Sequence, residues 1–316
     1  MKVRFHLPGL RHTYPLNMLV ANMLRSFPEF FRPGVEIASF YGEFPTSRWN
    51  GGRFSNGDQC DAGYIRHVVE SINSQGIGIC YTFTNPMITP ADLNDPYCNF
   101  CMMAADNGQN GVLVVSPLLE AYIREKYPGF QIGSSGDKQI QDVDALNREL
   151  EQDYGLAVLD YNLNNRFDLL GQIGHREKCA VLVNSCCVPK CPRREEHNKQ
   201  VARQQYVVLK NRGMSPDKQA PVPDWHCEYK GRNSLYTIRD YPTFVSPDDI
   251  WEKYVPMGFE NFMIEGRTAN LFSLIDRYAH YMMKPERRDE GRLMLTLSLE
   301  RSRVIQVNKP RKSPWI

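Results

Sequence analysis

The chain has 316 residues, with 38 lysines and arginines against 36 aspartates and glutamates, so its formal net charge is +2. Hydrophobic residues make up 42% and charged residues 23% of the sequence, and this composition excludes a disordered chain and a coiled coil. The small net charge gives no argument for a nucleic-acid partner. Because we find neither an apolar run of membrane-spanning length nor a signal peptide, we expect a cytoplasmic protein.

Eight short apolar runs predict β-strands, and amphipathic stretches between them predict helices. The predicted strands are Val3–Leu7, Val35–Tyr41, Gly76–Thr84, Gly111–Val115, Phe130–Ser134, Leu156–Asp160, Ala180–Asn184 and Asn261–Glu265. The predicted helices are Leu16–Phe31, Ala62–Ser74, Pro117–Tyr127, Asp142–Asp153, Arg166–His175, Pro247–Tyr254 and Ala269–Met283. Continuous apolar runs are typical of parallel strands covered by helices, so we predict a (β/α)8 barrel. The alternative is an open doubly wound sheet, but no glycine-rich dinucleotide fingerprint follows the first strand.

The barrel is predicted to span residues 1–285 and to carry an insertion at 192–246, between its seventh and eighth strands. A charged helix over Arg193–Val207 and short strands around Leu235–Tyr241 are expected within this insertion. Such a barrel usually has about 250 residues, so the surplus length must lie in insertions and extensions.

Residues 286–316 are predicted to form a C-terminal extension, with a β-like run at Leu293–Leu299 and a basic end at Lys309–Lys312. The basic end and the pair Arg193 and Arg194 are candidates for contact with RNA, although a few basic residues are usually only a solvated surface. A small-molecule substrate and a protein partner are the other expectations, and the sequence carries no signal for the oligomeric state.

Polar residues gather where the predicted strands end, which is where (β/α)8 barrels carry their catalytic groups. The candidates for direct catalysis are Glu265, Arg267, Asp160 and Asn184, and those for substrate contact are Asn85, Asn162, Asn164 and Tyr41. Any single one of them could be an ordinary polar loop residue. Their shared position at one end of the barrel predicts an active site there.

The nine cysteines are an odd number in a chain that we expect to stay reduced, which argues against a disulfide framework. Cys187 and Cys191 lie in the loop after the seventh strand, spaced so that two thiolates can face one centre. Cys227, in the insertion, is the candidate third ligand. The fourth is Cys186 or Cys179, although Cys179 begins its strand and belongs at the opposite end of the barrel. Soft thiolates suit an iron–sulfur cluster or zinc.

The remaining cysteines have simpler interpretations. Cys98 and Cys101 would share one face of a helix and are interpreted as buried thiols. Cys80 lies within an apolar strand and is predicted to be a core residue. Cys60 lies in a loop without an assignable role. A Cys–His pair of the thiol-peptidase kind stays open as an alternative site.

Two segments in the last third of the chain resemble the collagenase-like peptidase family U-32. The sequence Ser-Pro-Asp-Asp-Ile-Trp begins at Ser246, and Met-Gly-Phe-Glu-Asn-Phe-Met-Ile-Glu-Gly-Arg runs from Met257 to Arg267. The family signature is an apolar run ending in Lys-Ile-Glu-Gly-Arg, and Met263 stands here in place of the lysine. The cysteine-rich stretch after the preceding strand occupies the same relative position as the cysteine motif of the family.

This resemblance implies a TIM-like barrel enzyme that holds one [4Fe-4S] cluster through four cysteines. It also implies oxygen-independent hydroxylation chemistry, or peptidase activity, on a substrate that the sequence does not identify. We expect Cys187, Cys191, Cys227 and Cys186 to hold the cluster, with zinc as the alternative metal. A peptidase or hydrolase on the same barrel and a zinc-stabilised binding protein are the competing hypotheses.

Overall fold

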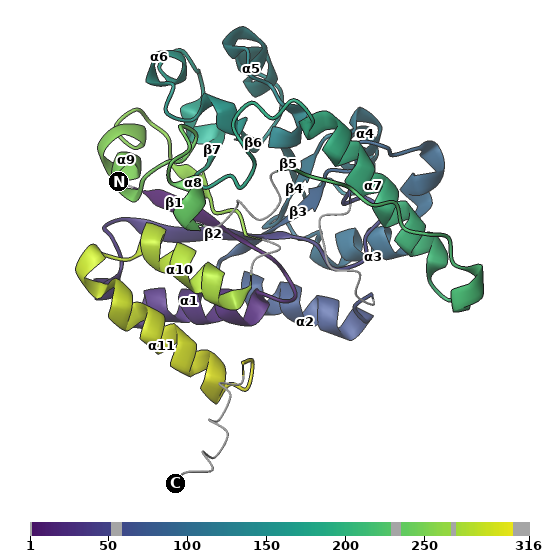
Figure 1. Ribbon diagram of the computed structural model, residues 1–316, viewed down its shortest axis with the longest axis horizontal. Coiled ribbons are helices and arrows are strands. Elements are labelled where there is room, and N and C mark those ends of the chain that lie inside the picture. Colours follow the sequence, from purple (N-terminus) through teal and green to yellow (C-terminus); the bar gives the residue numbers. More distant parts are fainter. Residues whose placement is uncertain (1, 52–58, 229–234, 267–269, 306–316) are drawn as a thin grey trace.

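Eight parallel strands pair in chain order and the eighth pairs with the first, which closes a barrel (Figure 1). The computed structural model describes residues 2–51, 59–228, 235–266 and 270–305. The strands are β1 (Val3–Pro8), β2 (Val35–Gly42), β3 (Gly78–Phe83), β4 (Gly111–Val114), β5 (Gln131–Ser134), β6 (Leu156–Val158), β7 (Cys179–Leu182) and β8 (Asn261–Met263). All eight predicted strands and the (β/α)8 barrel are therefore confirmed.

Helices surround the strands (Figure 1). They are α1 (Tyr14–Ser26), α2 (Ala62–Asn73), α3 (Pro96–Ala105), α4 (Pro117–Lys126), α5 (Val143–Leu150), α6 (Phe167–Leu170), α9 (Pro247–Asp249), α10 (Leu271–Met282) and α11 (Arg288–Arg301). In α2, the Asp61 side chain caps the first turn by accepting from the Tyr64 amide, and Ile65, Val68 and Ile72 are buried at helical spacing. This apolar stripe packs the helix onto the barrel.

The inside of the barrel is filled by an apolar layer that includes Tyr41, Cys80 and Met263. Leu182 of β7 and Met263 of β8 are paired across the sheet. Because side chains alternate along a strand, Asn184 and Glu265, two residues beyond this pair, lie at the C-terminal end of the barrel. The apolar layer therefore ends before the residues of the candidate site begin.

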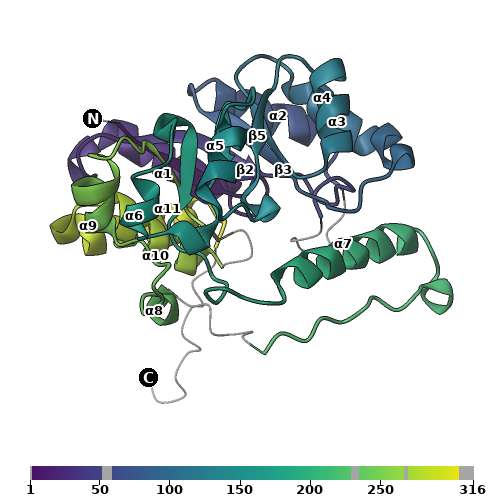
Figure 2. The same ribbon diagram turned by 90° about the horizontal axis from the view of Figure 1, so that it is seen from above.

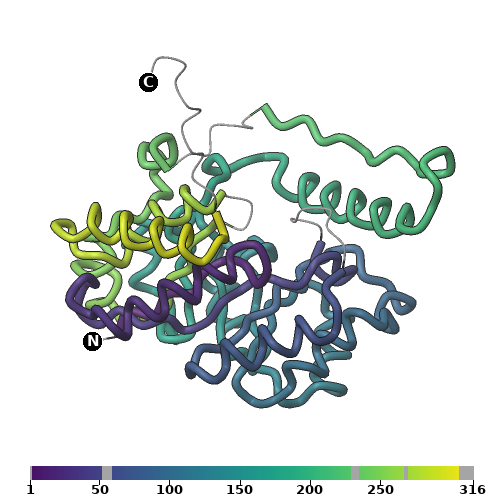
Figure 3. The backbone as a smooth tube through the Cα atoms, turned by 90° about the horizontal axis from the view of Figure 1, so that it is seen from below, coloured from purple at the N-terminus to yellow at the C-terminus, as the bar shows by residue number. Residues whose placement is uncertain are grey.

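Helix α7 (Arg194–Asn211) crosses the C-terminal end of the barrel and confirms the helix predicted in the insertion. At its start, Arg194 pairs with Asp160, which follows β6. Nearer its end, Gln205 donates to the Ser47 carbonyl in the loop after β2. Figures 2 and 3 show α7 and the extended chain after it lying along one side of the barrel. The insertion thus covers part of the end where the active site is expected.

Two predicted β segments are helical instead. The segment around Leu235–Tyr241 contains the short helix α8 (Leu235–Ile238). Its first and last residues, three positions apart, are both buried. The run Leu293–Leu299 belongs to α11, where Leu295 and Leu299 are buried and Leu293 and Leu297 are exposed. Leucines at every second position have the period of a strand. Every second leucine of this run is also four residues from the next, which suits a helix that is buried on one side.

Helix α11 packs against α1 and α10, so the described part of the C-terminal extension joins the outer helical layer (Figure 1). The predicted helix over Arg166–His175 is reduced to α6, and the one over Leu16–Phe31 ends as α1 at Ser26, before Pro28. Within the described ranges, no helix is long and apolar enough to cross a membrane.

Candidate active site at the C-terminal end of the barrel

The loop that follows β7, residues 185–191, carries three cysteines and is called the thiol loop. Tyr161 and Asn162, which follow β6, hold this loop in place. The Asn162 side-chain oxygen accepts from the Lys190 amide at 2.8 Å, and the Tyr161 hydroxyl donates to the Val188 carbonyl at 3.2 Å. Lys190 adopts a positive φ of 53°, which turns the chain toward Cys191. Asn162 thus positions the thiol loop, a role that its place after the sixth strand did not reveal.

The side chains of Cys187 and Cys191 interact with each other on this loop. The Tyr161 hydroxyl also hydrogen bonds to the Cys187 thiol. Burial raises the pKa of Cys187, and the neighbouring Cys191 raises it further, whereas the hydrogen bond from Tyr161 opposes the shift. These two thiols therefore interact, and their role as metal ligands stays a prediction.

Cys186 lies between a carboxylate and a guanidinium. Its amide donates to Glu265 Oε2 at 2.8 Å, and its sulfur accepts from Arg277 Nη2 at 3.8 Å. Burial, followed by the charge of Glu265, raises the pKa of the Cys186 thiol to about 12, and Arg277 opposes this. Cys186 is thus held between opposite charges, apart from the contact between Cys187 and Cys191.

Arg277 of α10 was not predicted from the sequence, although it is the buried cation of this site. It is 4% exposed, its Nη1 donates to the Glu265 carbonyl at 2.6 Å, and its Nε is buried without a hydrogen-bond partner in the described structure. A Cβ atom at Gly266 would lie 2.9 Å from Nη1, so the close approach of Arg277 requires glycine there. A usable signal existed, because Arg277 interrupts the apolar face that Leu274 and Tyr278 share.

The Asn184 side chain links the segment after β7 to the segment after β8, beyond the last paired residues of the two strands. Its side-chain oxygen accepts from the Glu265 amide at 2.7 Å, and its nitrogen donates to the Glu265 carbonyl at 3.0 Å. The side chain is fully buried and continues the sheet pairing in place of backbone groups. It therefore fixes the position of Glu265.

Asp160 forms a buried ion pair with Arg194 at the start of α7. The distance from Arg194 Nη1 to Asp160 Oδ2 is 2.5 Å, and the guanidinium lies over the Tyr161 ring at 4.5 Å from its centroid. The other Asp160 oxygen accepts from the Asn162 amide. With its side chain 11% exposed, Arg194 is engaged here rather than presented to RNA, and the ion pair ties the insertion to the barrel beside the thiol loop.

Three of the predicted substrate contacts are occupied by the protein itself. The Asn164 side chain donates to the carbonyls of Leu182 and Thr243, and the Tyr41 hydroxyl donates to the Ile264 carbonyl. Asn85, at the end of β3, is described next. Arg267 lies outside the described residues, so its predicted part in catalysis stays a prediction.

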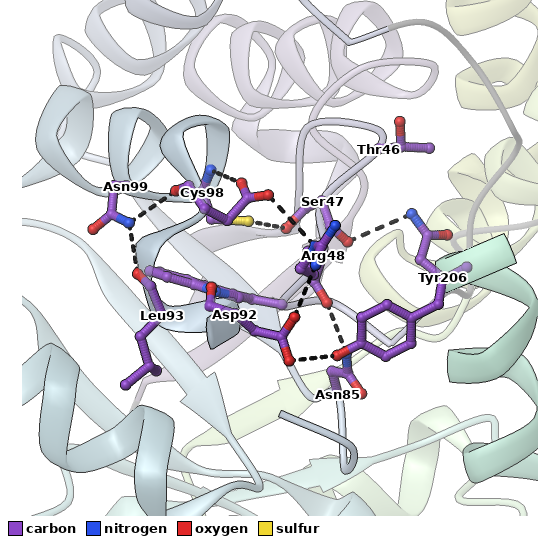
Figure 4. A network of polar contacts seen from close by, with 12 residues as sticks. Thr46, Ser47, Arg48, Asn85, Asp92, Leu93, Cys98, Asn99 and Tyr206 are labelled. Carbon is purple, nitrogen blue, oxygen red and sulfur yellow. Dashed lines mark hydrogen bonds and ion pairs between the residues drawn. The ribbon is translucent and has the colours of Figure 1, made fainter. Parts of the chain in front are cut away.

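Asn85 belongs to a network on the opposite side of the barrel end (Figure 4). Its nitrogen donates to the Arg48 carbonyl at 2.7 Å and to the Tyr206 hydroxyl of α7 at 3.2 Å. Asp92 accepts from that hydroxyl at 3.0 Å and from Arg48 at 3.0 Å. The Trp49 ring nitrogen donates to the Asp92 carbonyl. This group, called the β3 network, attaches the second half of α7 to the barrel.

The four thiols predicted to hold a metal are not gathered into one site in the described residues. Within the described ranges, which include all four predicted ligands, no three His, Cys, Asp or Glu side chains are arranged to hold a metal ion. Cys187 and Cys191 are in contact, Cys186 faces Glu265 and Arg277, and Cys227 lies close enough to Arg193 to interact with its charge. The described arrangement therefore brings two of the four predicted ligands together, and metal binding by them stays a prediction.

Four cysteines outside the thiol loop, Cys80, Cys98, Cys101 and Cys179, are buried as the sequence indicated. Cys98 and Cys101 lie on α3 and are buried, with the Cys98 sulfur 3.3 Å from the Ser47 hydroxyl. Cys80 is buried inside the barrel. Cys179 is buried at the start of β7, at the other end of that strand from the thiol loop. Its position excludes it from the loop as described.

Comparison with solved structures gives a structural likeness. Neither a protein-family model nor a curated protein matches the chain. A solved structure described as the U32 peptidase Mk0906 is similar, at 12% sequence identity and a TM-score of 0.49, over 84% of this chain and 92% of that one. At these values the likeness carries no argument about chemistry, and the barrel rests on its own strand pairing.

Proposed function

We propose that the chain is an enzyme whose active site lies at the C-terminal end of β6–β8 and whose thiol loop binds an iron–sulfur cluster. The observation that supports this most directly is the contact between the Cys187 and Cys191 side chains. It lies beside the buried Arg277 and the Asn184-anchored Glu265, at the end of the barrel where this fold carries its chemistry. The proposed reaction is a redox step of the oxygen-independent hydroxylation type.

The proposed ligands are Cys187 and Cys191 first, completed by Cys186 and Cys227. To complete the set, Cys186 has to leave Arg277 and Cys227 has to turn from Arg193 toward the loop. The binding free energy of a thiolate-held metal is large enough to drive such local rearrangement, because metal binding and folding are coupled. The same four thiolates suit zinc, which is the alternative metal.

When bound, such a cluster supplies electron transfer. The chain's own residues set the surroundings. While Arg277 contacts the Cys186 sulfur, its charge lowers the pKa of that thiol, but burial and Glu265 raise the pKa by more. Glu265 holds the Cys186 amide, and Asn184 holds Glu265. Helix α7 covers part of this end, which limits the access of water to it.

The test is anaerobic purification of the protein. Iron, sulfide and zinc are then measured, together with the absorption at about 400 nm that is expected of thiolate-bound clusters. We expect iron and sulfide in the unmodified protein, their loss in Cys187→Ser and Cys191→Ser, and their retention in the control Cys60→Ser, which removes a half-buried thiol outside the loop.

Two results would contradict the cluster. Colourless protein with stoichiometric zinc would assign the thiols to a structural zinc site instead. Metal-free protein that cleaves peptides, and loses this activity in Cys187→Ser, would assign a thiol peptidase.

A further inference from the structure

A second group of charged residues lies around His280, near the end of α10. Four arginines interact with this side chain: Arg32 from the segment before β2, Arg239 after α8, and Arg288 and Arg292 from the first turns of α11. None of these residues contacts the thiol loop in a hydrogen bond that the structure describes. They are called the arginine cluster.

His280 shows how the cluster is arranged. The distance between Arg239 Nη2 and His280 Nδ1 is 3.3 Å, and Arg288 Nη2 donates to the His280 carbonyl at 2.9 Å. An arginine can only donate, so His280 Nδ1 accepts and the proton of the neutral ring is on Nε2. This Nε2 is buried and has no hydrogen-bond partner within the described part of the chain. The Nε atoms of Arg32 and Arg288 are in the same condition. The cluster therefore presents several donors and lacks acceptors.

The carboxylates near the arginine cluster form ion pairs with only some of its members. Arg32 pairs with Asp248 at 2.7 Å, and Arg292 pairs with Asp276 at 2.7 Å and with Asp289 on the solvent side. Across the described ranges, no carboxylate lies within ion-pair distance of Arg239 or Arg288. Two guanidinium groups are thus left next to other cations without a paired anion.

This arrangement lowers the pKa of two groups, His280 and Arg288. Burial, followed by the charges of Arg239, Arg288, Arg292 and Arg32, lowers the pKa of His280 to about 3. Burial and then Arg32 lower the pKa of Arg288, although Asp248 opposes the shift. Like charges held together in a partly buried place are unfavourable unless an anion offsets them.

We propose that the arginine cluster is a binding site for a phosphate group. Guanidinium groups that approach from three segments, together with the His280 Nε2 donor, match the several acceptor oxygens and the double charge of a phosphate better than the two oxygens of one carboxylate. A phosphorylated small molecule fits this description best, because a nucleic-acid backbone phosphate carries one charge and two free oxygens. The backbone of a nucleic acid is the other source of phosphate, and the test below separates the two.

The test is calorimetric titration of the whole protein with pyrophosphate at low ionic strength. Arg288→Gln and Arg239→Gln each remove one unpaired cation, and the control Arg166→Gln removes an exposed cation that is paired with Asp168 elsewhere on the barrel. We expect affinity to fall by about tenfold or more in the first two variants, as loss of a charge-assisted contact implies, and to stay unchanged in the control. Arg239 is exposed, so Arg239→Gln keeps the test available if Arg288→Gln does not fold.

The His280 ring gives a second measurement. Bound pyrophosphate offsets the surrounding cations, so the pKa of His280 should rise in an NMR titration, with the resonance assigned through His280→Gln. No pyrophosphate binding, or equal binding in Arg288→Gln, Arg239→Gln and Arg166→Gln, would overturn the proposal. If short single-stranded RNA displaces pyrophosphate and is weakened by the same variants, the natural phosphate is that of a nucleic acid; if it does not, a small phosphorylated molecule is the ligand.

Discussion

The thiol loop and the β3 network lie at the same end of one barrel, yet they use buried polar groups in opposite ways. In the β3 network, Asp92 accepts from Thr89, Arg48 and Tyr206, and Asn85 uses both ends of its amide. The Arg48 Nε has no hydrogen bond in the described structure, but it lies 3.6 Å from the Asp95 carboxylate. Beside the thiol loop, the Arg277 Nε is buried without a partner, and Cys186 carries a strongly raised pKa. Burial of polar residues therefore does not by itself mark an active site. Incomplete satisfaction of their hydrogen bonds and charges is the better guide.

The largest effect is expected from Asp160→Ala, because it removes the nearer of the two carboxylates that pair with the buried Arg194 guanidinium and leaves only Asp137, at 3.9 Å. Removing one partner of a buried ion pair typically costs about 3–5 kcal/mol. Urea denaturation measures the loss, and Asp168→Ala is the control, since that residue pairs with Arg166 on the exposed surface. Equal stability of both variants would show that Asp160 is not needed to hold α7 on the thiol side.

A smaller loss is expected from Asn85→Ala in the β3 network. It removes the contacts with the Arg48 carbonyl, the Met87 amide and the Tyr206 hydroxyl, and an unsatisfied buried group costs about 1–3 kcal/mol. Tyr206→Phe removes only the hydroxyl and should cost about 1 kcal/mol. If Asn85→Ala leaves stability unchanged but weakens substrate binding once a substrate is known, the predicted substrate contact is correct and our comparison is wrong.

Arg277→Met should change chemistry more than stability. Arg277→Met removes the hydrogen bond to the Glu265 carbonyl, which still accepts from Asn184, and the loss of one such bond costs about 1 kcal/mol. Because Arg277 lowers the pKa of Cys186, its loss should raise that pKa further and slow alkylation of Cys186 by iodoacetamide. Mass spectrometry of the labelled peptide measures the rate, and Arg277→Lys, which keeps the charge, should retain much of it. Unchanged alkylation in Arg277→Met would remove Arg277 from the proposed site.

The smallest effect concerns acid stability in the β3 network. Burial raises the pKa of Asp92, but hydrogen bonds from Thr89, Arg48 and Tyr206 outweigh it and lower the pKa overall. Ionised Asp92 therefore stabilises the fold above the ordinary aspartate pKa of about 3.9, and this contribution is lost as the pH falls through the lower folded value. Asp92→Asn should make unfolding free energy, followed from neutral to acidic pH, fall less steeply. An unchanged slope would contradict the saturated network.

The sequence predicted the strands well because each buried parallel strand is a continuous apolar run bounded by loop residues. It failed where a local pattern fits two structures. The leucines from Leu293 to Leu299 satisfy both a strand and a helix, and only packing against α1 and α10 selects the helix. The same limit applies to the site. Sequence position placed Asp160, Asn184 and Glu265 at the end of the barrel. The interrupted apolar face of α10 marks Arg277 as a buried charge, but only the fold places it beside Cys186.

The sequence by itself determined the barrel, the helix of the insertion and the gathering of thiols after the seventh strand, because these follow from local hydrophobic patterns and residue order. Only the tertiary structure decided which polar residues are saturated and which are left with unmet charge or hydrogen bonds. That property depends on partners far apart in the chain, as Asn85 and Tyr206 are at 121 residues and Cys186 and Arg277 at 91. No local pattern records such distances, and burial makes each of those contacts decisive.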